Sequence, residues 1–433
     1  MSNTPRNILV VGAGPAAWRF VRAYHEGAEA AGRAADTITV LNDEPYTPYD
    51  RVAIEQLFKD PEKDLTLGDP ELWNAENINL VNNCHAEKLD RNRRVVTDTE
   101  GNEYPYDVLI FATGSRAVRI PILNSDAAHV FRTVDDVKNM VSEVNRLQST
   151  LGRAPRGIVV GGGLLGLEAA EGLKELGAEP TILDVAPWLL SVEVDQGGGY
   201  AVNAQIKATG IDIETGVFIS GINKDADGNV VSVSIADSPS EDANIRTLPA
   251  DMVVFGAGIR PNDELALAAD MHIGERGGIV VNDACHTSDE HIWAIGEVAC
   301  VLGRTWGLVA PANAMADAVA ANLLNDNEEA KVEEFDIATK LKFSGVQVAG
   351  FGDRRGTTEG CLEVLFADPA RGMYQKIVTS GDAKTLLGGV FVGDTAPFDS
   401  LKPLLGRELP AEPNVYLTAA GGGDGIPDTE LPD

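Results

Sequence analysis

The length, composition and charge of the chain limit what the protein can be. Of its 433 residues 44% are apolar and 23% charged, an ordinary globular balance, and a chain this long is expected to form two or three domains. The formal net charge of −31, from 66 acidic and 35 basic residues, argues against binding to nucleic acid or to an anionic membrane. No apolar stretch is long enough to span a bilayer, and the N-terminus runs straight into a strand pattern. We therefore expect a cytoplasmic protein without a cleaved signal peptide.

A β-α-β pattern occurs twice along the chain. The first copy has a strand at 7–11, a helix over about 16–30 and a strand at 37–41. The second copy begins about 150 residues later, with a strand at 157–160, a helix over 164–176 and a strand at 180–183. An internal repeat of this size indicates two related nucleotide-binding folds.

Other segments lie around these two repeats. Strands are predicted at 87–90, 94–97, 103–105, 108–111, 251–255, 292–295, 362–366 and 386–392, and helices over 134–147 and 311–324. A charged linker covers 325–334. The tail 419–433 is rich in glycine, proline and acidic residues, and we expect it to be disordered.

The turn of the first repeat has the composition of a dinucleotide-binding loop, Gly12-Ala13-Gly14-Pro15-Ala16-Ala17. Glycine at 12 and 14 leaves room for a tight turn and for a pyrophosphate at the helix N-terminus, where the helix dipole is positive, and Ala17 lets helix and strand pack closely. Asp43 and Glu44 follow the second strand, where a carboxylate can accept hydrogen bonds from an adenosine ribose. A tight structural turn would explain the glycines alone, whereas the acids favour a binding function.

The turn of the second repeat, Gly161-Gly162-Gly163-Leu164-Leu165-Gly166, again joins a strand to a helix. Gly161, Gly163 and Gly166 occupy the three fingerprint positions. Asp184 ends the next strand, about twenty residues on, as this kind of site requires. Its carboxylate would repel a 2′-phosphate, and the VAPWLL stretch after it has no cation to bind one. We therefore predict a preference for NADH over NADPH.

Two later motifs, ATGS at 112–115 and IGE at 295–297, each follow a strand. A cofactor held by both Thr113-Gly114 and Gly296-Glu297 requires that the first fold be interrupted and resumed around the second. We expect Glu297 to face the ribityl or pyrophosphate region of FAD. A helix beginning near Pro311 would point its N-terminus at the flavin, where its dipole stabilises the negative charge of the reduced ring.

The predicted fold class is α/β, with two Rossmann-like dinucleotide-binding domains and a small C-terminal α+β domain. The FAD-binding domain is discontinuous and comprises 1–120 and 257–330. The NADH-binding domain is inserted at 121–256. The C-terminal domain is expected at 335–418, before the tail.

This layout resembles the pyridine nucleotide–disulfide oxidoreductase superfamily. The stretches EPYTPYDRV, GGGLLGLEAAEGLKELG, APWLL and WGLVAPANAMA further resemble the N-terminal flavoprotein half of the large subunit of assimilatory NADH-dependent nitrite reductase, from Asn7 to about Val415. In that family FAD and NADH feed electrons through an iron–sulfur segment to a sirohaem that reduces nitrite. The resemblance implies an FAD-dependent NADH:acceptor oxidoreductase with a redox partner that carries an iron–sulfur cluster or haem.

The resemblance also implies roles for individual residues. FAD-binding positions are occupied by Gly12, Gly14, Asp43, Glu44, Arg51, Thr113, Gly114, Gly296 and Glu297. NADH-binding positions are occupied by Gly161, Gly163, Gly166, Asp184 and Gly258. Glu168 matches a catalytic-site carboxylate that contacts the nicotinamide amide in similar reductases; a helix-face carboxylate paired elsewhere is the alternative. The guanidinium of Arg51 can pair with the FAD pyrophosphate, and a plain surface salt bridge is its alternative.

The sequence departs from the family pattern at several points. Ile54-Glu55-Gln56 stand where similar reductases often have Leu-Ser-Lys, so a lysine near the flavin is missing. Glu297 stands where aspartate is usual. The cysteine-rich iron–sulfur segment and the sirohaem domain of nitrite reductase are absent from this sequence, so we expect that the chain does not reduce nitrite by itself. Whether it is a fragment of a longer reductase stays open.

The four cysteines, Cys84, Cys285, Cys300 and Cys361, are scattered and form no CxxC pair or cluster at metal-ligand spacing with histidines. Disulfide reductases of the superfamily need a CxxxxC pair near the first helix, and related oxidases keep one cysteine after the second strand. Neither pattern occurs here. We therefore expect no thiol relay and no metal site.

Four functional hypotheses remain. The leading one is the electron-input module of a nitrite or nitrate reductase. The alternatives within enzymes are a stand-alone ferredoxin- or rubredoxin-type reductase and an NADH oxidase. A different class is an NADH-binding redox sensor or assembly protein without useful turnover, which the missing lysine motivates. The oligomeric state is open, and a homodimer is compatible with the sequence.

Overall fold

The computed structural model describes residues 4–417 except 69, 241, 336 and 344, and these residues form two compact units. The first unit comprises the described residues of 1–54, 62–116 and 259–336. The second comprises those of 55–61, 117–258 and 337–433. No α-helix within this described part is both long enough and apolar enough to cross a membrane. The predicted disordered tail, 419–433, lies outside the described residues.

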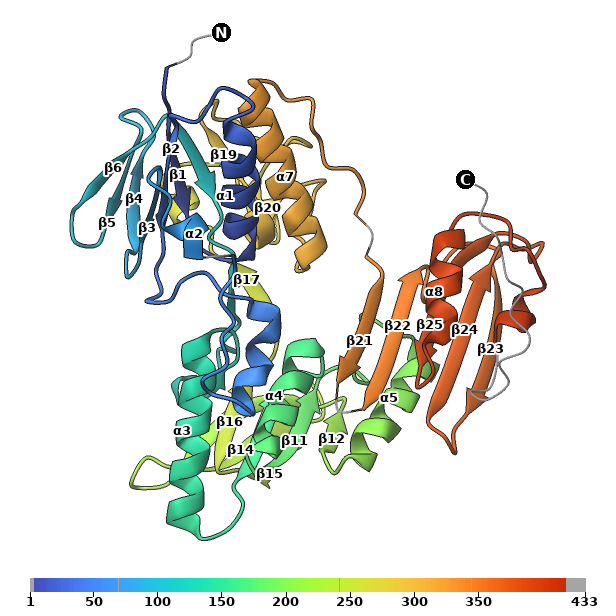
Figure 1. The fold of residues 1–433 in the computed structure, drawn as a ribbon. Coiled ribbons are helices and arrows are strands. Elements are labelled where there is room, and N and C mark those ends of the chain that lie inside the picture. Colours follow the sequence, from blue (N-terminus) through green and yellow to red (C-terminus); the bar gives the residue numbers. More distant parts are fainter. Residues whose placement is uncertain (1–3, 69, 241, 336, 344, 418–433) are drawn as a thin grey trace. The chain divides into compact units, whose positions relative to one another are not determined.

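The first unit is built on a five-stranded parallel sheet in the order β19-β7-β1-β2-β3 (Figure 1). Its strands are β1 (Asn7–Val11), β2 (Thr37–Leu41), β3 (Ile78–Val81), β7 (Val108–Phe111) and β19 (Ile292–Ala294). Most of their side chains are apolar and buried, which is typical of a parallel sheet covered on both faces. Ile292 pairs with Leu109, so the chain leaves this sheet after β7 and returns to complete it. The predicted interruption of the first fold is thereby confirmed.

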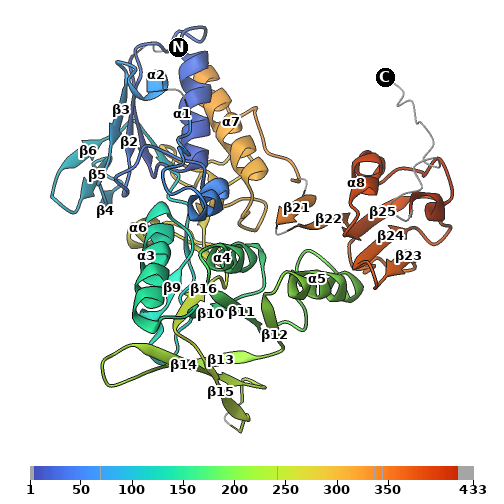
Figure 2. The ribbon, with the colours of Figure 1, turned by 60° about the horizontal axis from the view of Figure 1, so that its bottom comes forward.

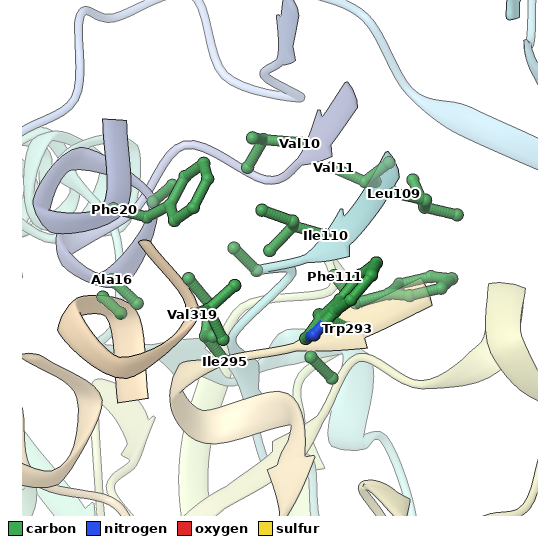
Figure 3. Close-up of a cluster of buried hydrophobic side chains, with 14 of the residues drawn as sticks. Val10, Val11, Ala16, Phe20, Leu109, Ile110, Phe111, Trp293, Ile295 and Val319 are labelled. Atoms are coloured by element: carbon green, nitrogen blue, oxygen red, sulfur yellow. The ribbon is translucent and has the colours of Figure 1, made fainter. Parts of the chain in front are cut away.

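Two helices lie side by side against this sheet, α1 (Pro15–Ala28) and α7 (Val309–Asn325) (Figure 2). Arg19 of α1 and Asp317 of α7 form a bidentate ion pair with N–O distances of 2.7 and 2.9 Å. Beneath them, Phe20 and Val319 belong to the same buried cluster as the sheet residue Ile110 (Figure 3). Both helices begin slightly before the predicted positions, α1 at Pro15 because proline is favoured in the first turn.

The remaining elements of the first unit are short. The predicted meander is a three-stranded antiparallel sheet of β4 (Ala86–Asp90), β5 (Val95–Asp98) and β6 (Glu103–Pro105). Further elements are α2 (Pro70–Trp73), α6 (Glu264–Ala268), β17 (Ile259–Pro261), β18 (Ile279–Val280), β20 (Ala299–Cys300) and the 3-10 helix η3 (Gly296–Val298). Two elements extend from one unit into the other, the 3-10 helix η1 (Arg51–Phe58) and β8 (Ser115–Ala117).

The second unit repeats the plan of the first with a parallel sheet in the order β12-β11-β10-β16-β9. Its strands are β9 (His129–Val130), β10 (Arg156–Val160), β11 (Glu179–Asp184), β12 (Asp212–Thr215) and β16 (Met252–Phe255). Its helices are α3 (Val134–Leu151), α4 (Leu164–Glu175), α5 (Gln196–Ala208) and the 3-10 helix η2 (Ser125–Ala127). An antiparallel sheet of β13 (Phe218–Lys224), β14 (Val230–Ala236) and β15 (Ile245–Pro249) precedes β16.

The C-terminal part of the second unit is an antiparallel sheet in the order β21-β22-β25-β24-β23. Its strands are β21 (Thr339–Phe343), β22 (Val346–Gly352), β23 (Leu362–Asp368), β24 (Met373–Thr379) and β25 (Leu386–Val392). It ends in α8 (Ala396–Leu401) and the 3-10 helices η4 (Lys402–Leu404) and η5 (Pro413–Tyr416). Helix α5 contacts β22, β24 and β25 of this sheet (Figure 2). The predicted fold class is therefore confirmed.

Residues 55–61 pack with the second unit, although we expected them within a domain spanning 1–120. The ring of Phe58 lies so close to α4 that a Cβ on Gly172 would be 2.2 Å from it, and it stacks on Phe131 with 5.6 Å between the ring centroids. The apolar ring of Phe58 thus anchors this segment to α4. The predicted domain bounds, 1–120 with 257–330, 121–256 and 335–418, stay a prediction.

From the packing of the core of the first unit we predict that one substitution strongly lowers the free energy of unfolding. Phe111, at the end of β7, is fully buried (Figure 3), so Phe111→Ala should lower the free energy of unfolding by about 3–5 kcal/mol. Leu302→Ala is the control, because the Leu302 side chain is 49% exposed, and it should cost less than about 1 kcal/mol. Urea denaturation followed by circular dichroism measures both. Equal losses in the two variants would contradict this assignment of the core.

Candidate functional site

The first glycine turn joins β1 to α1. Glycine is required at its first position because two backbone segments come into close contact there. Gly12 has a φ of +102°, and a Cβ there would lie 2.3 Å from the carbonyl oxygen of Ala112. Gly14 is the N-cap of α1 and provides no side-chain hydrogen bond, so the N–H groups of the first helical turn remain available to an external acceptor. Ala17 is fully buried against the sheet, as its small size allows. The turn can therefore bind an anionic group.

Arg51 places a cation beside this turn. Its Nε lies 3.9 Å from the position that a Cβ on Gly14 would occupy. Its guanidinium is ion-paired with Glu44 and donates to the hydroxyl of Tyr49 at 2.9 Å, and that hydroxyl donates to Glu44 at 2.7 Å. Burial alone would lower the pKa of Arg51, but Tyr49, Glu44 and Glu297 raise it overall. Arg51 therefore stays charged. Arg51, Glu44 and Tyr49 form one hydrogen-bonded cluster beside the first glycine turn.

The late GE motif lies against the same turn. Gly296 has a φ of +76°, and a Cβ there would lie 2.9 Å from the Cβ of Ala16 in the first turn of α1. Glu297 accepts a hydrogen bond from the hydroxyl of Ser115. The structure thus brings together motifs that are almost 300 residues apart in the sequence.

The ATGS motif is held by a residue that the sequence analysis did not single out. Asn262 donates through its side-chain amide to the carbonyl of Thr113 at 2.9 Å, and its backbone carbonyl accepts from the Thr113 hydroxyl at 2.6 Å. Its backbone N–H donates to the carbonyl of Gly114 at 3.0 Å. Asn262, Ser115 and Tyr49 were all missed, although Ser115 and Tyr49 belong to motifs quoted above and Asn262 lies four residues after Gly258. Their polar side chains next to those motifs were the available signal.

Two residues predicted to bind FAD, Pro311 and Asp43, lie outside the cluster around Arg51. Pro311 is buried in the first turn of α7, whose N-cap residue Leu308 makes no side-chain cap. Asp43 is exposed and pairs with His85 at 3.1 Å, whereas Glu44 faces Arg51. The structure therefore brings Glu44, and not Asp43, into the cluster around Arg51.

The second glycine turn joins β10 to α4. Its three fingerprint glycines are present for different reasons. A Cβ on Gly161, which has a φ of +120°, would lie 2.4 Å from the carbonyl oxygen of Gly256, and one on Gly166 would lie 1.8 Å from that of Gly161. Packing therefore excludes any side chain at these two positions. A Cβ on Gly163 would meet no atom within 4 Å, and Gly163 is the N-cap of α4 without a side-chain cap. Packing gives no reason for glycine at 163, whereas a ligand approaching the helix N-terminus does.

Asp184 braces this turn. One carboxylate oxygen accepts from the backbone N–H of Gly162, and the other accepts from Ala186 at 2.7 Å. Each carboxylate oxygen has a second acceptor site, so Asp184 can still receive a hydroxyl. Gly258, after β16, has a φ of +97°, and a Cβ there would meet no atom within 4 Å.

Glu168 lies on α4 beside a cavity of about 300 Å³. The cavity is lined by Glu55, Gln56, Lys59, Glu168, Glu171, Gly172, Glu175, Phe343 and Gly345. Burial, together with the negative charges of Glu55 and Glu171, raises the pKa of Glu168 to about 8. At neutral pH the carboxyl is therefore mostly protonated and can donate a hydrogen bond. Gln56, where similar reductases often have lysine, lines the same cavity, and Lys59 pairs with Glu175 at 2.6 Å.

All four cysteines are free thiols. Cys84, Cys285 and Cys300 are buried, and burial raises the pKa of each of these three thiols. Within the described ranges no group of three or more histidine, cysteine, aspartate or glutamate side chains is arranged to hold a metal ion.

Residues 6–321 match the family model described as pyridine nucleotide-disulphide oxidoreductase. The chain belongs to this family. Its members use FAD and NAD(P)H. Residues 338–409 match a second model, the rubredoxin NAD+ reductase C-terminal domain.

Individual relatives agree with this assignment. The chain is 35% identical to the NADH nitrite reductase large subunit of Escherichia coli K12 over 98% of its length, and it spans about half, 49%, of that subunit. It is 28% identical to the NADH-rubredoxin oxidoreductase of Clostridium acetobutylicum, over 80% of the chain and 81% of that protein. A crystal structure of a ferredoxin reductase from Rhodopseudomonas palustris superimposes with a TM-score of 0.77 at 25% identity, covering 95% of this chain and 97% of the other. The resemblance to the flavoprotein half of nitrite reductase is thereby confirmed.

The second turn generates a test with an internal control. Gly163→Ala should change the melting temperature by less than about 2 °C, because the added Cβ meets no atom. It should weaken the binding of tetrahydro-NADH, a non-reducing analogue, by about tenfold or more, because the Cβ occupies the approach to the helix N-terminus. Gly166→Ala should lower the melting temperature, since its Cβ clashes with the Gly161 carbonyl. Isothermal titration and a thermal melt measure these effects. Unchanged affinity in Gly163→Ala would remove Gly163 from the ligand site.

The pKa of Glu168 predicts how stability depends on pH. It is raised from an ordinary value of 4.5 to about 8, so between these values the folded protein keeps a proton that the unfolded chain releases. This group therefore makes the protein less stable as the pH rises through that interval. Between about pH 5 and about pH 9 the free energy of unfolding should fall by roughly 2–4 kcal/mol less in Glu168→Gln than in the wild type. Urea unfolding at the two pH values measures this difference, and identical pH dependence in both proteins would contradict the assignment.

Proposed function

We propose that the protein is an FAD-dependent NADH:acceptor oxidoreductase that acts as the electron-input module of a nitrite or nitrate reductase. The observation that carries the proposal is a glycine turn in each unit that ends at a helix N-terminus without a side-chain cap. Two such sites in one chain of this family fit two dinucleotides, FAD in the first unit and NADH in the second. The strongly acidic chain repels both anions at long range, so these N–H groups must supply the local attraction.

The residues of the first unit fit FAD. The N-terminus of α1 after Gly14 has no side-chain cap, so its N–H groups can bind a pyrophosphate, and Arg51 adds a cation beside them. The carboxylates of Glu44 and Glu297 offer acceptors for ribose and ribityl hydroxyls. Arg51 can turn from Glu44 to the pyrophosphate, so that binding exchanges one charge pair for another. Bound FAD would supply the chemistry, because a flavin accepts a hydride and can release electrons one at a time.

The residues of the second unit fit NADH. The pyrophosphate would occupy the space in front of Gly163, and Asp184 would accept a hydrogen bond from a ribose hydroxyl and repel a 2′-phosphate. The protonated Glu168 would bind the nicotinamide amide by donating to its carbonyl oxygen. These residues bind and orient the nucleotide, and alignment is the main task that hydride transfer sets for a protein.

Two similarities to known proteins support the proposal that the electron acceptor carries an iron–sulfur cluster or haem. The identity of 35% over 98% of the chain to the Escherichia coli nitrite reductase subunit favours an acceptor of that system, with an iron–sulfur cluster or haem. The match of residues 338–409 to the rubredoxin reductase C-terminal domain favours, as the second candidate, a small iron–sulfur protein such as rubredoxin.

Rapid mixing of the FAD-loaded protein with NADH tests the proposal. The visible flavin band should bleach in less than about one second at saturating NADH, and NADPH should react at least about tenfold more slowly because of Asp184. Gly163→Ala is the matched control and should require higher NADH concentrations for the same rate. Absence of bleaching with every nucleotide would refute the proposal.

The acceptor is tested by reoxidising the reduced protein. Fast reoxidation by the iron–sulfur and sirohaem part of a nitrite reductase supports the leading proposal, and fast reoxidation by rubredoxin alone supports the second candidate. Peroxide or water production at turnover rates in air, without a protein partner, would assign an oxidase instead. Slow reoxidation by every acceptor would indicate a sensor.

A further inference from the structure

We infer that the C-terminal domain controls NADH affinity through residues 185–195, here called the strap, and that Arg355 and Lys376 are positioning residues for NADH binding. The strap follows Asp184 and ends at Asp195, the N-cap of α5. One part of it touches the second glycine turn, and two parts are held by the C-terminal domain. The inference rests on the proposed function, because it takes this turn as the site of NADH.

The strap is fastened to the glycine turn at Leu189 and Leu190. The backbone N–H of Leu190 donates to the carbonyl oxygen of Gly162 at 2.8 Å, and a Cβ on Gly162 would lie 2.4 Å from the side chain of Leu189. Leu190 has a φ of +52°, a conformation that leucine seldom adopts, so its surroundings must hold it there. Both leucines are fully buried. Any shift of the strap therefore moves Gly162, the neighbour of Gly163.

The C-terminal end of the strap is bound by a buried lysine. Lys376 of β24 has a side chain only 1% exposed, and its Nζ pairs with Asp195 at 2.7 Å and with Glu363 at 2.9 Å. The hydroxyl of Tyr374 donates to the same oxygen of Asp195 at 2.8 Å, while the other oxygen caps α5 by accepting from Gly198. A buried cation with two carboxylate partners holds its geometry strongly, because removing a partner leaves an uncompensated charge.

The middle of the strap is held as well. Arg355 of the C-terminal domain donates to the carbonyl oxygen of Ser191, and the N–H of Leu189 donates to Asn203 of α5 at 3.1 Å. Trp188 packs on the first turn of α5 so closely that a Cβ on Gly199 would lie 2.1 Å from its ring. The strap is thus bound at closely spaced points to the turn, to α5 and to the C-terminal sheet.

The consequence concerns the preorganisation of the NADH site. The N–H groups near Gly163 bind a pyrophosphate well only if they are already in place, because ordering them on binding costs affinity. Loss of the Arg355 or Lys376 contacts frees the strap, and with it the carbonyl of Gly162 that Leu190 holds. The expected result is weaker NADH binding, with unchanged FAD content and an unchanged rate once NADH saturates the protein.

The experiment compares Arg355→Ala and Lys376→Met with Arg371→Ala in the FAD-loaded full chain. Arg371 is an exposed arginine of the same domain whose ion pair, with Asp368, stays within one β-hairpin. Titration calorimetry with tetrahydro-NADH gives the Kd, and steady-state assays give KM and kcat. We expect the Kd and KM to rise about 3- to 30-fold in Arg355→Ala and Lys376→Met, with kcat within about twofold of the wild type and with Arg371→Ala unchanged.

The outcomes separate this inference from the proposed function. If the wild type fails to bind the analogue, the proposed function falls and the inference with it. If the wild type binds and both Arg355→Ala and Lys376→Met bind equally well, only the inference is overturned. Equal weakening in Arg371→Ala would also overturn it, because the effect would then be general. If Lys376→Met does not fold, Arg355→Ala decides alone, since it removes an exposed side chain.

Discussion

The structure depends on close contact between backbones at the two glycine turns. At Gly12 the chain passes against the carbonyl of Ala112, and at Gly161 it passes against that of Gly256. In each case the last residue before the turn belongs to a central strand, and the contact is made with the end of the neighbouring parallel strand. Each contact lies just before a helix, because α1 begins at Pro15 and α4 at Leu164. The uncapped helix N-termini on which the proposed function rests therefore follow from how the central strands of each unit end.

The charges at the two turns are organised differently. In the first unit a cation, Arg51, is held by Glu44 and Tyr49, so an incoming anion competes with a carboxylate. In the second unit Asp184 accepts from the N–H of Gly162 in the turn and from that of Ala186 after its own strand, which fixes the backbone and places a negative charge beside the turn. A 2′-phosphate would meet that charge directly. Under the proposed function, selectivity against a 2′-phosphate would therefore come from the same carboxylate that stabilises the turn.

Local pattern predicted much of this fold from the sequence. Periodicity and turn chemistry predicted the glycines at 12, 14, 161, 163 and 166, the helices α1, α3, α4 and α7, and most of the parallel strands, whereas β3, β9 and β12 were missed. Helix α5 was not predicted, because Gly197, Gly198 and Gly199, which are poor helix formers, lie in its first turn. Packing explains two of these glycines, because a Cβ on Gly197 would lie 2.4 Å from the ring of Tyr374 and one on Gly199 would lie 2.1 Å from the ring of Trp188. The contact of Lys376 with Asp195 was likewise beyond reach, because the spacing of these two residues in the sequence carries no signal.

The interrupted sheet of the first unit has a consequence for the order of synthesis. Strand β7 receives its outer partner, β19, only when Ile292 to Ala294 have been translated. Until then the nascent chain carries β7 with one edge lacking its neighbour, while residues 117–258 of the inserted unit already contain all five of their parallel strands. An unpaired strand edge is prone to pair with other chains. Because its sheet is discontinuous, the nascent chain therefore needs its β7 edge shielded from other chains until β19 has been synthesised.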